Sequence, residues 1–195
     1  YAFDSTTIDL CLNVFWWACF RKAKGAIKIH TLYDIKTSIP AFVHITEGNV
    51  HDVNALDVLT YEAGGFYIMD KAYVDFKRLF TINISLAYYV TRAKENFNFK
   101  RISSVKSDKT NGIICDQIVK LKGVKSSSFY PVALRRIKYF DKEQQRTFVF
   151  LTNNFTQSAV DIAMLYKYRW KVELFFKWIK QHLKIKSFWG TSMNA

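Results

Sequence analysis

The pattern of hydrophobic and polar residues predicts that strands dominate the first quarter of this chain. Residues 1–10 combine β-branched side chains with partial alternation, which is typical of a strand with one buried face. Residues 26–33 and 38–46 are two further strand-like runs that follow each other across a short polar turn. This spacing predicts strands joined as antiparallel hairpins.

The next part of the chain alternates helical patterns with short apolar runs. Residues 66–70 and 87–91 are mainly apolar, which is typical of strands buried on both faces. Residues 53–59 and 75–82 have helical patterns, and Asp52 either caps the first of these helices or belongs to a functional site. Buried strands that alternate with helices indicate an α/β fold.

Residues 94–153 differ in character from the segments before them. Lys and Ser become frequent, and the alternating runs at 112–121, 132–140 and 146–151 predict short strands. Residues 139–146 have the polar composition of a hairpin tip. We therefore predict an all-β insertion, rich in Lys and Arg, before the last helix.

The last pattern is that of a helix, which begins at Thr156 or Ser158 and runs through residues 166–183 without Gly or Pro. At about 100° per residue, its side chains divide into an apolar line and a polar line. The apolar line comprises Val172, Phe176, Ile179 and Leu183. The polar line comprises Tyr166, Arg169, Glu173, Lys177, Lys180 and Lys184. The polar line is either a solvated face with Glu–Lys pairs or a carboxylate metal ligand flanked by phosphate-binding cations.

The composition narrows the possible functions. The 195 residues include 29 Lys and Arg against 16 Asp and Glu, a formal net charge of +13, which favours a polyanionic partner, nucleic acid before a membrane surface. The alternative explanation of this charge is solubility. Three cysteines without a CxxC pair indicate neither a disulfide framework nor a zinc ribbon and fit a reducing cytoplasm. Since the apolar runs are too short to span a bilayer and no signal peptide is visible, no membrane partner is expected.

Three carboxylates stand out from these patterns. Asp4 lies in the middle of a strand, Asp70 ends a buried strand, and Glu173 stands in the row of cations. Each has an ordinary explanation on its own, as a hydrogen-bond acceptor, a turn former or a partner of a lysine. Together they match the oxygen ligands that Mg²⁺ or Mn²⁺ needs for phosphoryl transfer on DNA.

Several motifs of the chain occur together in one known family. The final helix has the spacing Y-x2-R-x3-E-x6-K, carried by Tyr166, Arg169, Glu173 and Lys180. Residues 4–6 and 70–76 match the family's first and second Asp motifs, and residues 24–30 and 175–192 match the segments next to its acids. In this order and spacing, the chain resembles the DDE transposases of the insertion-sequence-four type.

The resemblance implies a fold and a domain arrangement. It implies a ribonuclease H-like mixed sheet flanked by helices, with a catalytic core formed by residues 1–93 and 154–195. Residues 94–153 would be the β-rich insertion between the second Asp and the Glu. The N-terminal DNA-binding segment that precedes the first Asp in family members is expected to be absent from this chain.

The resemblance also implies a chemistry. Asp4, Asp70 and Glu173 would be catalytic and would hold two divalent ions, Mg²⁺ or Mn²⁺. Residues on the cationic face would contact DNA phosphates; these are Tyr166, Arg169, Lys177, Lys180 and Lys184. The protein would cleave and transfer strands at insertion-sequence ends, bind double-stranded DNA at transposon ends and target, and form a homodimer in a synaptic complex. A cytoplasmic bacterial location, at the nucleoid when bound to DNA, follows from the same resemblance.

Some positions depart from the family pattern, and other functions remain open. Lys71 and Ala72 replace the Arg and Gly that are common in the family, and a left-handed turn at Ala72 would cost about 1 kcal/mol. Without a Trp in the insertion, Phe129 or Tyr130 would be the aromatic residue that stacks a flipped base. An inactive DNA-binding remnant and a ribonuclease H-like nuclease are the alternatives. His182, on the opposite side of the helix from Glu173, is expected to be structural.

Overall fold

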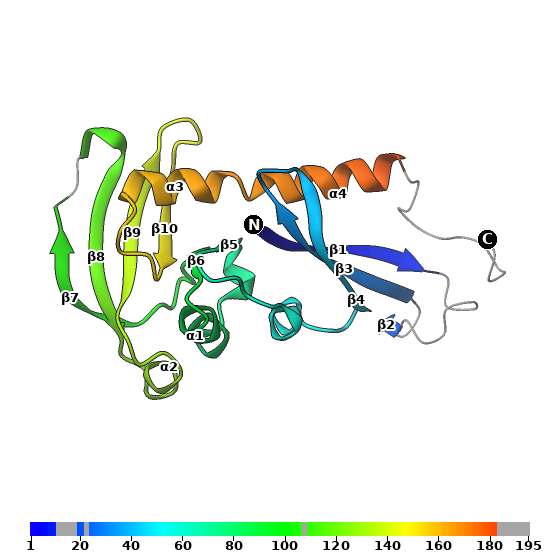
Figure 1. Ribbon diagram of the computed structural model, residues 1–195, viewed down its shortest axis with the longest axis horizontal. Coiled ribbons are helices and arrows are strands. Elements are labelled where there is room, and N and C mark those ends of the chain that lie inside the picture. The colour runs from blue at the N-terminus through cyan, green and yellow to red at the C-terminus, as the bar shows by residue number, and fades with distance from the viewer. Residues whose placement is uncertain (11–18, 22–23, 107–108, 183–195) are drawn as a thin grey trace. The chain divides into compact units, whose positions relative to one another are not determined.

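The computed structural model describes residues 1–10, 19–21, 24–106 and 109–182. The chain divides into two compact units, which we describe separately. The terminal unit comprises Tyr1–Val58 and Arg169–Ala195, and the central unit comprises Leu59–Tyr168. Figure 1 shows the elements of both units.

The terminal unit is built on antiparallel strands. Its elements are β1 (Ala2–Leu10), β2 (Cys19–Arg21), β3 (Lys24–Asp34), β4 (Ile39–Glu47), the 3-10 helix η1 (Asp52–Val58) and α4 (Trp170–His182). Strand β3 pairs antiparallel with β1, β2 and β4. The predicted antiparallel hairpin of the second and third strand runs is therefore confirmed.

A small apolar core joins α4 to the strands of the terminal unit. Val172 and Phe176 of α4 are buried with Ala2 of β1 and Tyr33 of β3. Phe175 packs beside them, with its ring centroid 5.2 Å from that of Tyr33. The first two positions of the predicted apolar line thus form the core contact, each contributing roughly 1.5–3 kcal/mol through burial. Of the remaining two positions, Ile179 is half-buried and Leu183 lies outside the described residues.

The central unit contains a mixed sheet with helices. Its strands are β5 (Phe66–Met69), β6 (Tyr88–Arg92), β7 (Phe99–Val105), β8 (Ile113–Leu121), β9 (Leu134–Asp141) and β10 (Arg146–Thr152). Its helices are η2 (Lys71–Tyr73), α1 (Phe76–Ile84), η3 (Lys109–Asn111), α2 (Val124–Phe129) and α3 (Ala159–Lys167). Strands β5 and β6 are parallel, and the sheet continues antiparallel through β10, β9, β8 and β7. The predicted α/β class and mixed sheet are confirmed.

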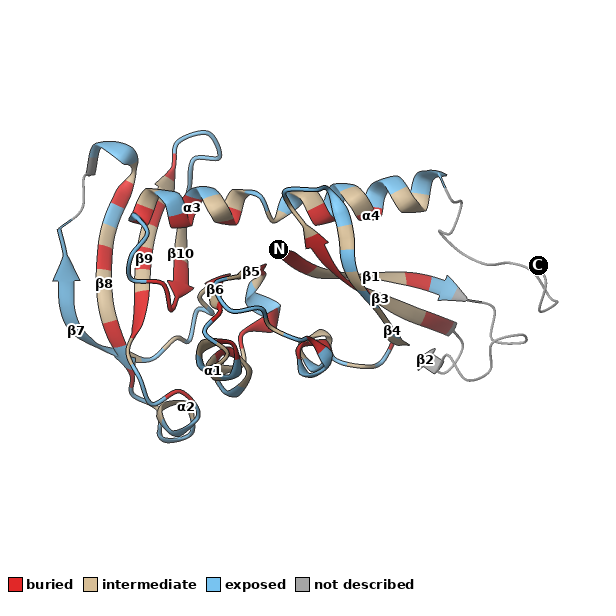
Figure 2. Cartoon of the chain, viewed as in Figure 1, coloured by how far each residue is buried: buried red, intermediate tan, exposed pale blue. Residues whose placement is uncertain are grey.

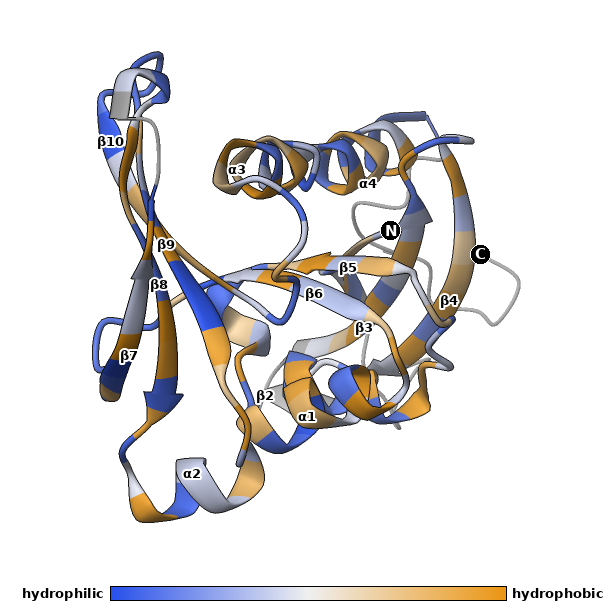
Figure 3. Cartoon of the chain, turned by 60° about the vertical axis from the view of Figure 1, so that its left-hand side comes forward, coloured by the Kyte–Doolittle hydropathy of each residue, from blue (hydrophilic) through white to orange (hydrophobic). Residues whose placement is uncertain are grey.

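Burial in this sheet follows the sequence pattern. In β5, Tyr67, Ile68 and Met69 are almost completely buried, as expected for a strand without alternation. Strand β8 alternates between buried and exposed positions, whereas β7 is exposed along nearly its whole length (Figure 2). Hydrophobic and hydrophilic residues accordingly alternate along these strands in Figure 3.

The segment 94–153 is rich in strands, but the prediction that it is all-β is wrong. It contains α2 and the short helix η3. In α2 the hydroxyls of Ser126, Ser127 and Ser128 each donate to the carbonyl three residues earlier, at 3.0, 3.2 and 3.0 Å. These bonds satisfy backbone acceptors within a helical turn, in a run of serines whose composition alone favours a loop. The proposed boundaries at 93 and 154 stay a prediction.

The prediction of one uninterrupted helix through residues 166–183 is wrong as well. Helix α3 starts after Ser158, whose side chain accepts a bond from the backbone N–H of Asp161, and ends at Lys167. The N–H of Tyr168 bonds the carbonyl of Leu165 at 3.1 Å, which tightens the last turn, and α4 begins only at residue 170. The predicted polar line is therefore split. Tyr166 lies in α3, Arg169 lies between the two helices, and Glu173, Lys177 and Lys180 lie in α4, whereas Lys184 lies outside the described residues.

The described helices are all too short or too polar to cross a membrane.

Candidate active site

Asp4 and Glu173 are brought together in the terminal unit by one arginine. Arg169 donates from Nη1 to Oδ2 of Asp4 at 2.7 Å and from Nη2 to Oε1 of Glu173 at 2.5 Å. Asp4 also accepts the N–H of Ser5 at 2.9 Å. An acid within a strand is costly unless it is paired, and here both of its oxygens have donors.

These two acids line a pocket of about 650 Å³ within the terminal unit. Its cations come from α4, where Lys177 and Lys180 stand one and two turns after Glu173. Lys180 donates from Nζ to the carbonyl of Thr7 at 2.9 Å, and Lys177 is exposed. The pocket therefore combines carboxylates with lysine cations, which are the groups that bind a divalent metal ion and a phosphate respectively.

Asp70 lies in the central unit, directly after β5. Its Oδ1 accepts two bonds from Arg92, from Nε at 3.0 Å and from Nη2 at 2.6 Å, and a third from the hydroxyl of Tyr166 at 3.3 Å. Its backbone carbonyl accepts the hydroxyl of Thr91 at 3.1 Å. The carboxylate is therefore held by neighbouring elements, as a rigid functional group would be.

Arg92 was not among the predicted site residues. It ends β6, and the parallel register that pairs Met69 with Thr91 sets Arg92 beside Asp70. The sequence contains only a weak signal for this contact, namely an arginine at the end of the second buried strand. An arginine of the predicted site, Arg169, has the equivalent role in the terminal unit.

Tyr166 is buried more deeply than a phosphate-binding residue on a helix surface would be. It is 9 % exposed and packs against Phe150, with ring centroids 4.8 Å apart. The hydroxyl of Tyr166 donates to the carboxylate of Asp70, so in this structure Tyr166 helps to position Asp70. The predicted contact of Tyr166 with DNA stays a prediction, and Lys184 lies outside the described residues.

Two secondary predictions concern Ala72 and His182. The strain that a left-handed turn would cause at Ala72 does not arise, because residues 71–73 form η2 and the non-glycine residues of the described chain with positive φ are Ser38, Leu86 and Gln145. Nδ1 of His182 donates to the carbonyl oxygen of Trp178 at 3.0 Å, and its ring stacks on the Trp178 ring, which fits a structural role.

The two aromatic candidates for base stacking differ in exposure. Tyr130 is 1 % exposed and packs edge-on against Phe80 and Tyr89, and burial raises the pKa of its hydroxyl to about 12. A stacking role for Tyr130 is therefore wrong. Phe129 is 46 % exposed and remains accessible.

Asp52 belongs to a polar network that the sequence did not predict. It lies inside the first turn of η1, accepts the hydroxyl of Ser5 at 2.9 Å and pairs with Nζ of Lys28 at 3.1 Å. Neighbouring His30 is fully buried and bonds the hydroxyl of Thr46 at 2.9 Å, and burial lowers the pKa of its imidazole to about 4. The side chain of Ser5 thus bonds Asp52 in this network, whereas the side chain of the preceding residue, Asp4, bonds Arg169.

The side chains predicted to hold metal ions offer oxygen ligands, but the described residues do not arrange three of them around one position. Among them, no group of three or more His, Cys, Asp or Glu side chains is arranged to hold an ion. Asp4 and Glu173 meet at Arg169 in the terminal unit, and Asp70 lies in the central unit. Their carboxylate oxygens are the hard ligands that Mg²⁺ and Mn²⁺ prefer. The meeting of all three acids stays a prediction.

Comparison with known proteins gives a consistent result. A family model described as a transposase DDE domain matches residues 1–195. A protein of Sinorhizobium fredii named as transposase y4zB is 38 % identical over 196 residues, which cover 98 % of this chain. A transposase named for the insertion sequence element IS5377 of Geobacillus stearothermophilus is 31 % identical over 198 residues, also 98 % of this chain.

A third relative, named as a transposase for the insertion sequence element IS4SA of Synechocystis, is 24 % identical over 206 residues and matches 100 % of this chain. The chain spans about half the length of these curated relatives, namely 54 %, 50 % and 54 %.

Proposed function

This chain belongs to the transposase DDE domain family, and we propose that it carries out metal-dependent DNA strand cleavage and strand transfer at the ends of an insertion sequence. The observation that carries this proposal is the contact of Arg169 with both Asp4 and Glu173. Two acids from opposite ends of the chain converge on one cation beside a lysine-lined pocket. A solvated helix face would not need this convergence.

In the proposed site, Asp4, Asp70 and Glu173 would hold two Mg²⁺ or Mn²⁺ ions, which would supply positive charge at the scissile phosphate and lower the pKa of an attacking water or 3′-hydroxyl. The chain's own contribution is to hold the acids in fixed directions, through Arg169 for the first and third acids and through Arg92 and Tyr166 for Asp70.

The cations of α4 are proposed to bind the DNA backbone. Arg169 holds Asp4 and Glu173 through its two terminal nitrogens and adds positive charge that attracts a DNA phosphate, and Lys177 and Lys180 supply point charges beside the acids. The formal charge of +13 strengthens nonspecific attraction to double-stranded DNA and makes binding salt-dependent. A homodimeric synaptic complex is proposed from family membership.

The test is cleavage of DNA that contains the ends of the element. Asp70→Asn keeps the shape of the side chain and removes its charge, and it should abolish Mn²⁺-dependent nicking while duplex binding persists. The matched control is Asp75→Asn, because Asp75 caps α1 by accepting the N–H of Arg78 and asparagine caps equally well. Cleavage by Asp70→Asn at the wild-type rate would contradict the proposal.

The alternatives are separated by the same assay. An inactive remnant predicts no cleavage by the unaltered chain at any protein concentration, and the strain at residue 72 that favoured this alternative is absent. A ribonuclease H-like nuclease predicts that an RNA–DNA hybrid is cleaved in preference to duplex DNA. The lysines of the pocket beside Asp4 favour the transposase.

A further inference from the structure

One edge of the sheet in the terminal unit is open. Strand β4 pairs with β3, and no other described strand pairs with β4. Exposed positions alternate with half-buried ones along β4, and the first four exposed positions are all apolar, namely Ile39, Ala41, Val43 and Ile45. Ile39, Val43 and Ile45 are 61, 51 and 55 % exposed. A long, apolar edge strand of this kind is a template for pairing with another strand.

The hydrogen bonds to β3 identify the residues of β4 that direct their backbone groups to the open side. One residue beyond the end of β4 and in the same register, the N–H of Gly48 donates to the carbonyl of Ala26 at 2.8 Å. In an antiparallel ladder, every second residue of a strand bonds to the same neighbour. Counted back from Gly48, the even-numbered residues as far as His44 therefore bond to β3. The N–H and C=O groups of Val43 and Ile45 point to the open side.

This open side lacks most of the features that protect an edge strand. Charged side chains, a proline or a bulge on an edge oppose its pairing with another chain. Residues 38–46 contain no Lys, Arg, Asp or Glu, in a chain that has 29 Lys and Arg and 16 Asp and Glu. Pro40 and the register shift both lie near the start of β4. Residues 42–46 are therefore regular, uncharged and available for pairing.

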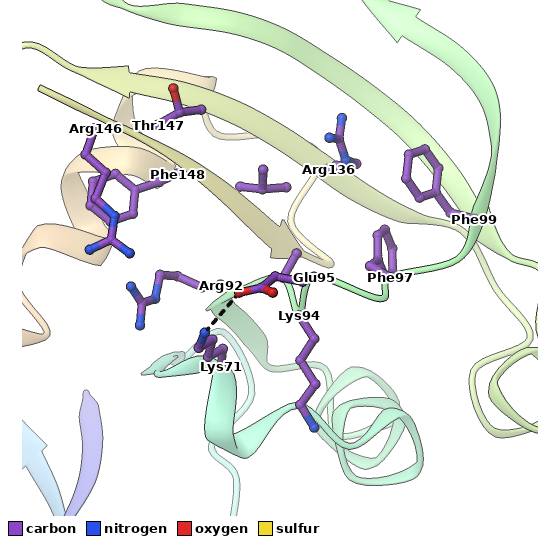
Figure 4. A pocket seen from close by; sticks show the side chains of 12 residues that line it. Lys71, Arg92, Lys94, Glu95, Phe97, Phe99, Arg136, Arg146, Thr147 and Phe148 are labelled. Atoms are coloured by element: carbon purple, nitrogen blue, oxygen red, sulfur yellow. Dashed lines mark ion pairs between the residues drawn. The ribbon is translucent and has the colours of Figure 1, made fainter.

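The edge strand of the central unit is protected, in contrast. Among the described strands, β7 pairs with β8 alone, and Lys100 and Arg101 are exposed on it. Its first residue, Phe99, lies against Arg136, whose guanidinium carbon is 5.0 Å from the centre of the ring (Figure 4). The two edges thus differ in chemistry, because β7 has cations where β4 has β-branched apolar residues.

We propose that β4 pairs antiparallel with β4 of a second copy of this chain, across a two-fold axis at His44. In this register Val43 of each copy lies opposite Ile45 of the other. The outward N–H and C=O groups of these two residues bond to each other, and their side chains form apolar pairs on one face of the joined sheets. The two His44 residues lie opposite each other on the other face.

A second copy suits this edge for two reasons. Each copy has a formal charge of +13, so contact through most surfaces would bring like charges together, whereas residues 38–46 place no Lys or Arg at the contact. Pairing of identical strands about a two-fold axis also uses the open edge of both copies, so association stops at the dimer. This inference does not rest on the proposed function, because the pairing needs neither DNA nor metal.

The first experiment measures the mass of the 195-residue chain by sedimentation velocity, in EDTA and without DNA. Concentrations from about 1 to 200 µM bracket the micromolar dissociation constant expected for an interface of one strand pair. Val43→Lys places a charge in each half of the interface and should raise the dissociation constant about tenfold or more. The matched control is Ile102→Lys, which makes the same change at a residue of β7 that is 53 % exposed. It should change the dissociation constant less than about twofold.

The second experiment tests the register. Ile45→Glu alone should weaken the dimer as Val43→Lys does. In the double variant Val43→Lys, Ile45→Glu, the new lysine of each copy lies opposite the new glutamate of the other. The dissociation constant should therefore return to within about threefold of that of the unaltered chain. A double variant that pairs no better than Val43→Lys would exclude this register.

The third experiment locates the two-fold axis by cross-linking. In the proposed pair, the two copies of residue 44 form a non-hydrogen-bonded pair with Cα atoms about 4.5 Å apart, which is within disulfide range. Mild oxidation of His44→Cys should therefore give a covalent dimer above the background from the native Cys11, Cys19 and Cys115. The matched control is Ile39→Cys, an exposed position whose two copies would lie about 34 Å apart along the paired strands.

Other outcomes overturn the pairing itself. An unaltered chain that stays monomeric at about 200 µM would leave the edge to a strand of a different protein, and assemblies larger than two copies would exclude a closed pair. Equal weakening by Val43→Lys and Ile102→Lys would assign the effect to net charge. Circular dichroism of each variant verifies folding. Because these readouts need no DNA, metal or cleavage, they fail separately from the proposed strand-transfer activity.

Discussion

Breaking one buried ion pair in the central unit should lower the stability of the protein unusually strongly. Arg135 of β9 donates to both oxygens of Asp116 of β8, at 2.9 and 2.7 Å, and Nη1 donates to the carbonyls of Asn154 and Gln157 at 3.2 and 2.6 Å. The two side chains are 5 % and 2 % exposed. The pair thus fixes the two strands to the loop that leads into α3, the helix that carries Tyr166.

Asp116→Leu replaces the carboxylate with an apolar side chain of similar length and leaves the charge of Arg135 buried without its partner. Loss of one member of a buried pair typically costs about 3–5 kcal/mol, because the remaining charge is desolvated and uncompensated. A domain has a free energy of unfolding of roughly 5–15 kcal/mol, so the variant should lose about a fifth of it or more. For a chain of this size the melting temperature should fall by roughly 10 °C.

Urea denaturation followed by circular dichroism measures this loss directly. The double variant Asp116→Leu, Arg135→Met replaces both charges with apolar groups and should recover most of the stability lost by the single variant. A loss below about 1 kcal/mol for Asp116→Leu, or a double variant no more stable than the single one, would refute the reasoning that an isolated buried charge causes the destabilisation.

Three further predictions concern backbone, pH and site geometry. Gly112 and Gly64 both have positive φ, at +83° and +78°, but a Cβ at Gly112 would meet the carbonyl oxygen of Phe140 at 2.6 Å, whereas a Cβ at Gly64 would meet nothing within 4 Å. Gly112→Ala should therefore lower the free energy of unfolding by clearly more than the roughly 1 kcal/mol expected for Gly64→Ala. Equal losses for the two variants in urea titrations would contradict this prediction. Burial lowers the pKa of His30 to about 4, so this side chain binds a proton more weakly in the folded than in the unfolded state. The free energy of unfolding should therefore be independent of His30 above pH 6.5 and should fall by about 3 kcal/mol between pH 6.5 and 4. If His30→Phe leaves the pH dependence of stability unchanged, His30 is not its cause. Tyr166→Phe removes the hydroxyl that bonds Asp70 and keeps the ring against Phe150. The rate of strand cleavage should fall about tenfold, while the free energy of unfolding should fall by only about 1 kcal/mol. An unchanged cleavage rate would show that the hydroxyl does not position Asp70.

Regular local patterns predicted much of the fold. Alternation in residues 1–10 and continuous apolarity in residues 66–69 correspond to β1 and to the buried strand β5, because the period of side-chain burial follows directly from strand geometry. The N-cap at Ser158 was one of two predicted starts of α3. These features depend on neighbouring residues alone.

Features that depend on tertiary contacts were missed. The break between α3 and α4 has no Gly or Pro to mark it, and Tyr166 and Arg169 on either side contact different acids, Asp70 and Asp4. Arg92 reaches Asp70 through the register of two parallel strands, and Asp52 reaches Ser5 across 47 positions of the chain. A single sequence does not specify such partners, because they are selected by strand pairing.

The central proposal is that Asp4, Asp70 and Glu173 hold the same metal ions. Calorimetric titration of Mn²⁺ into the protein bound to end-containing DNA tests it most directly, with Asp4→Asn, Asp70→Asn and Glu173→Gln compared with the Asp75→Asn control. The account predicts that each of the three variants loses tight Mn²⁺ binding and that the control retains it. Retention of full Mn²⁺ binding by Asp70→Asn, with loss in the Asp4 and Glu173 variants, would contradict a shared site.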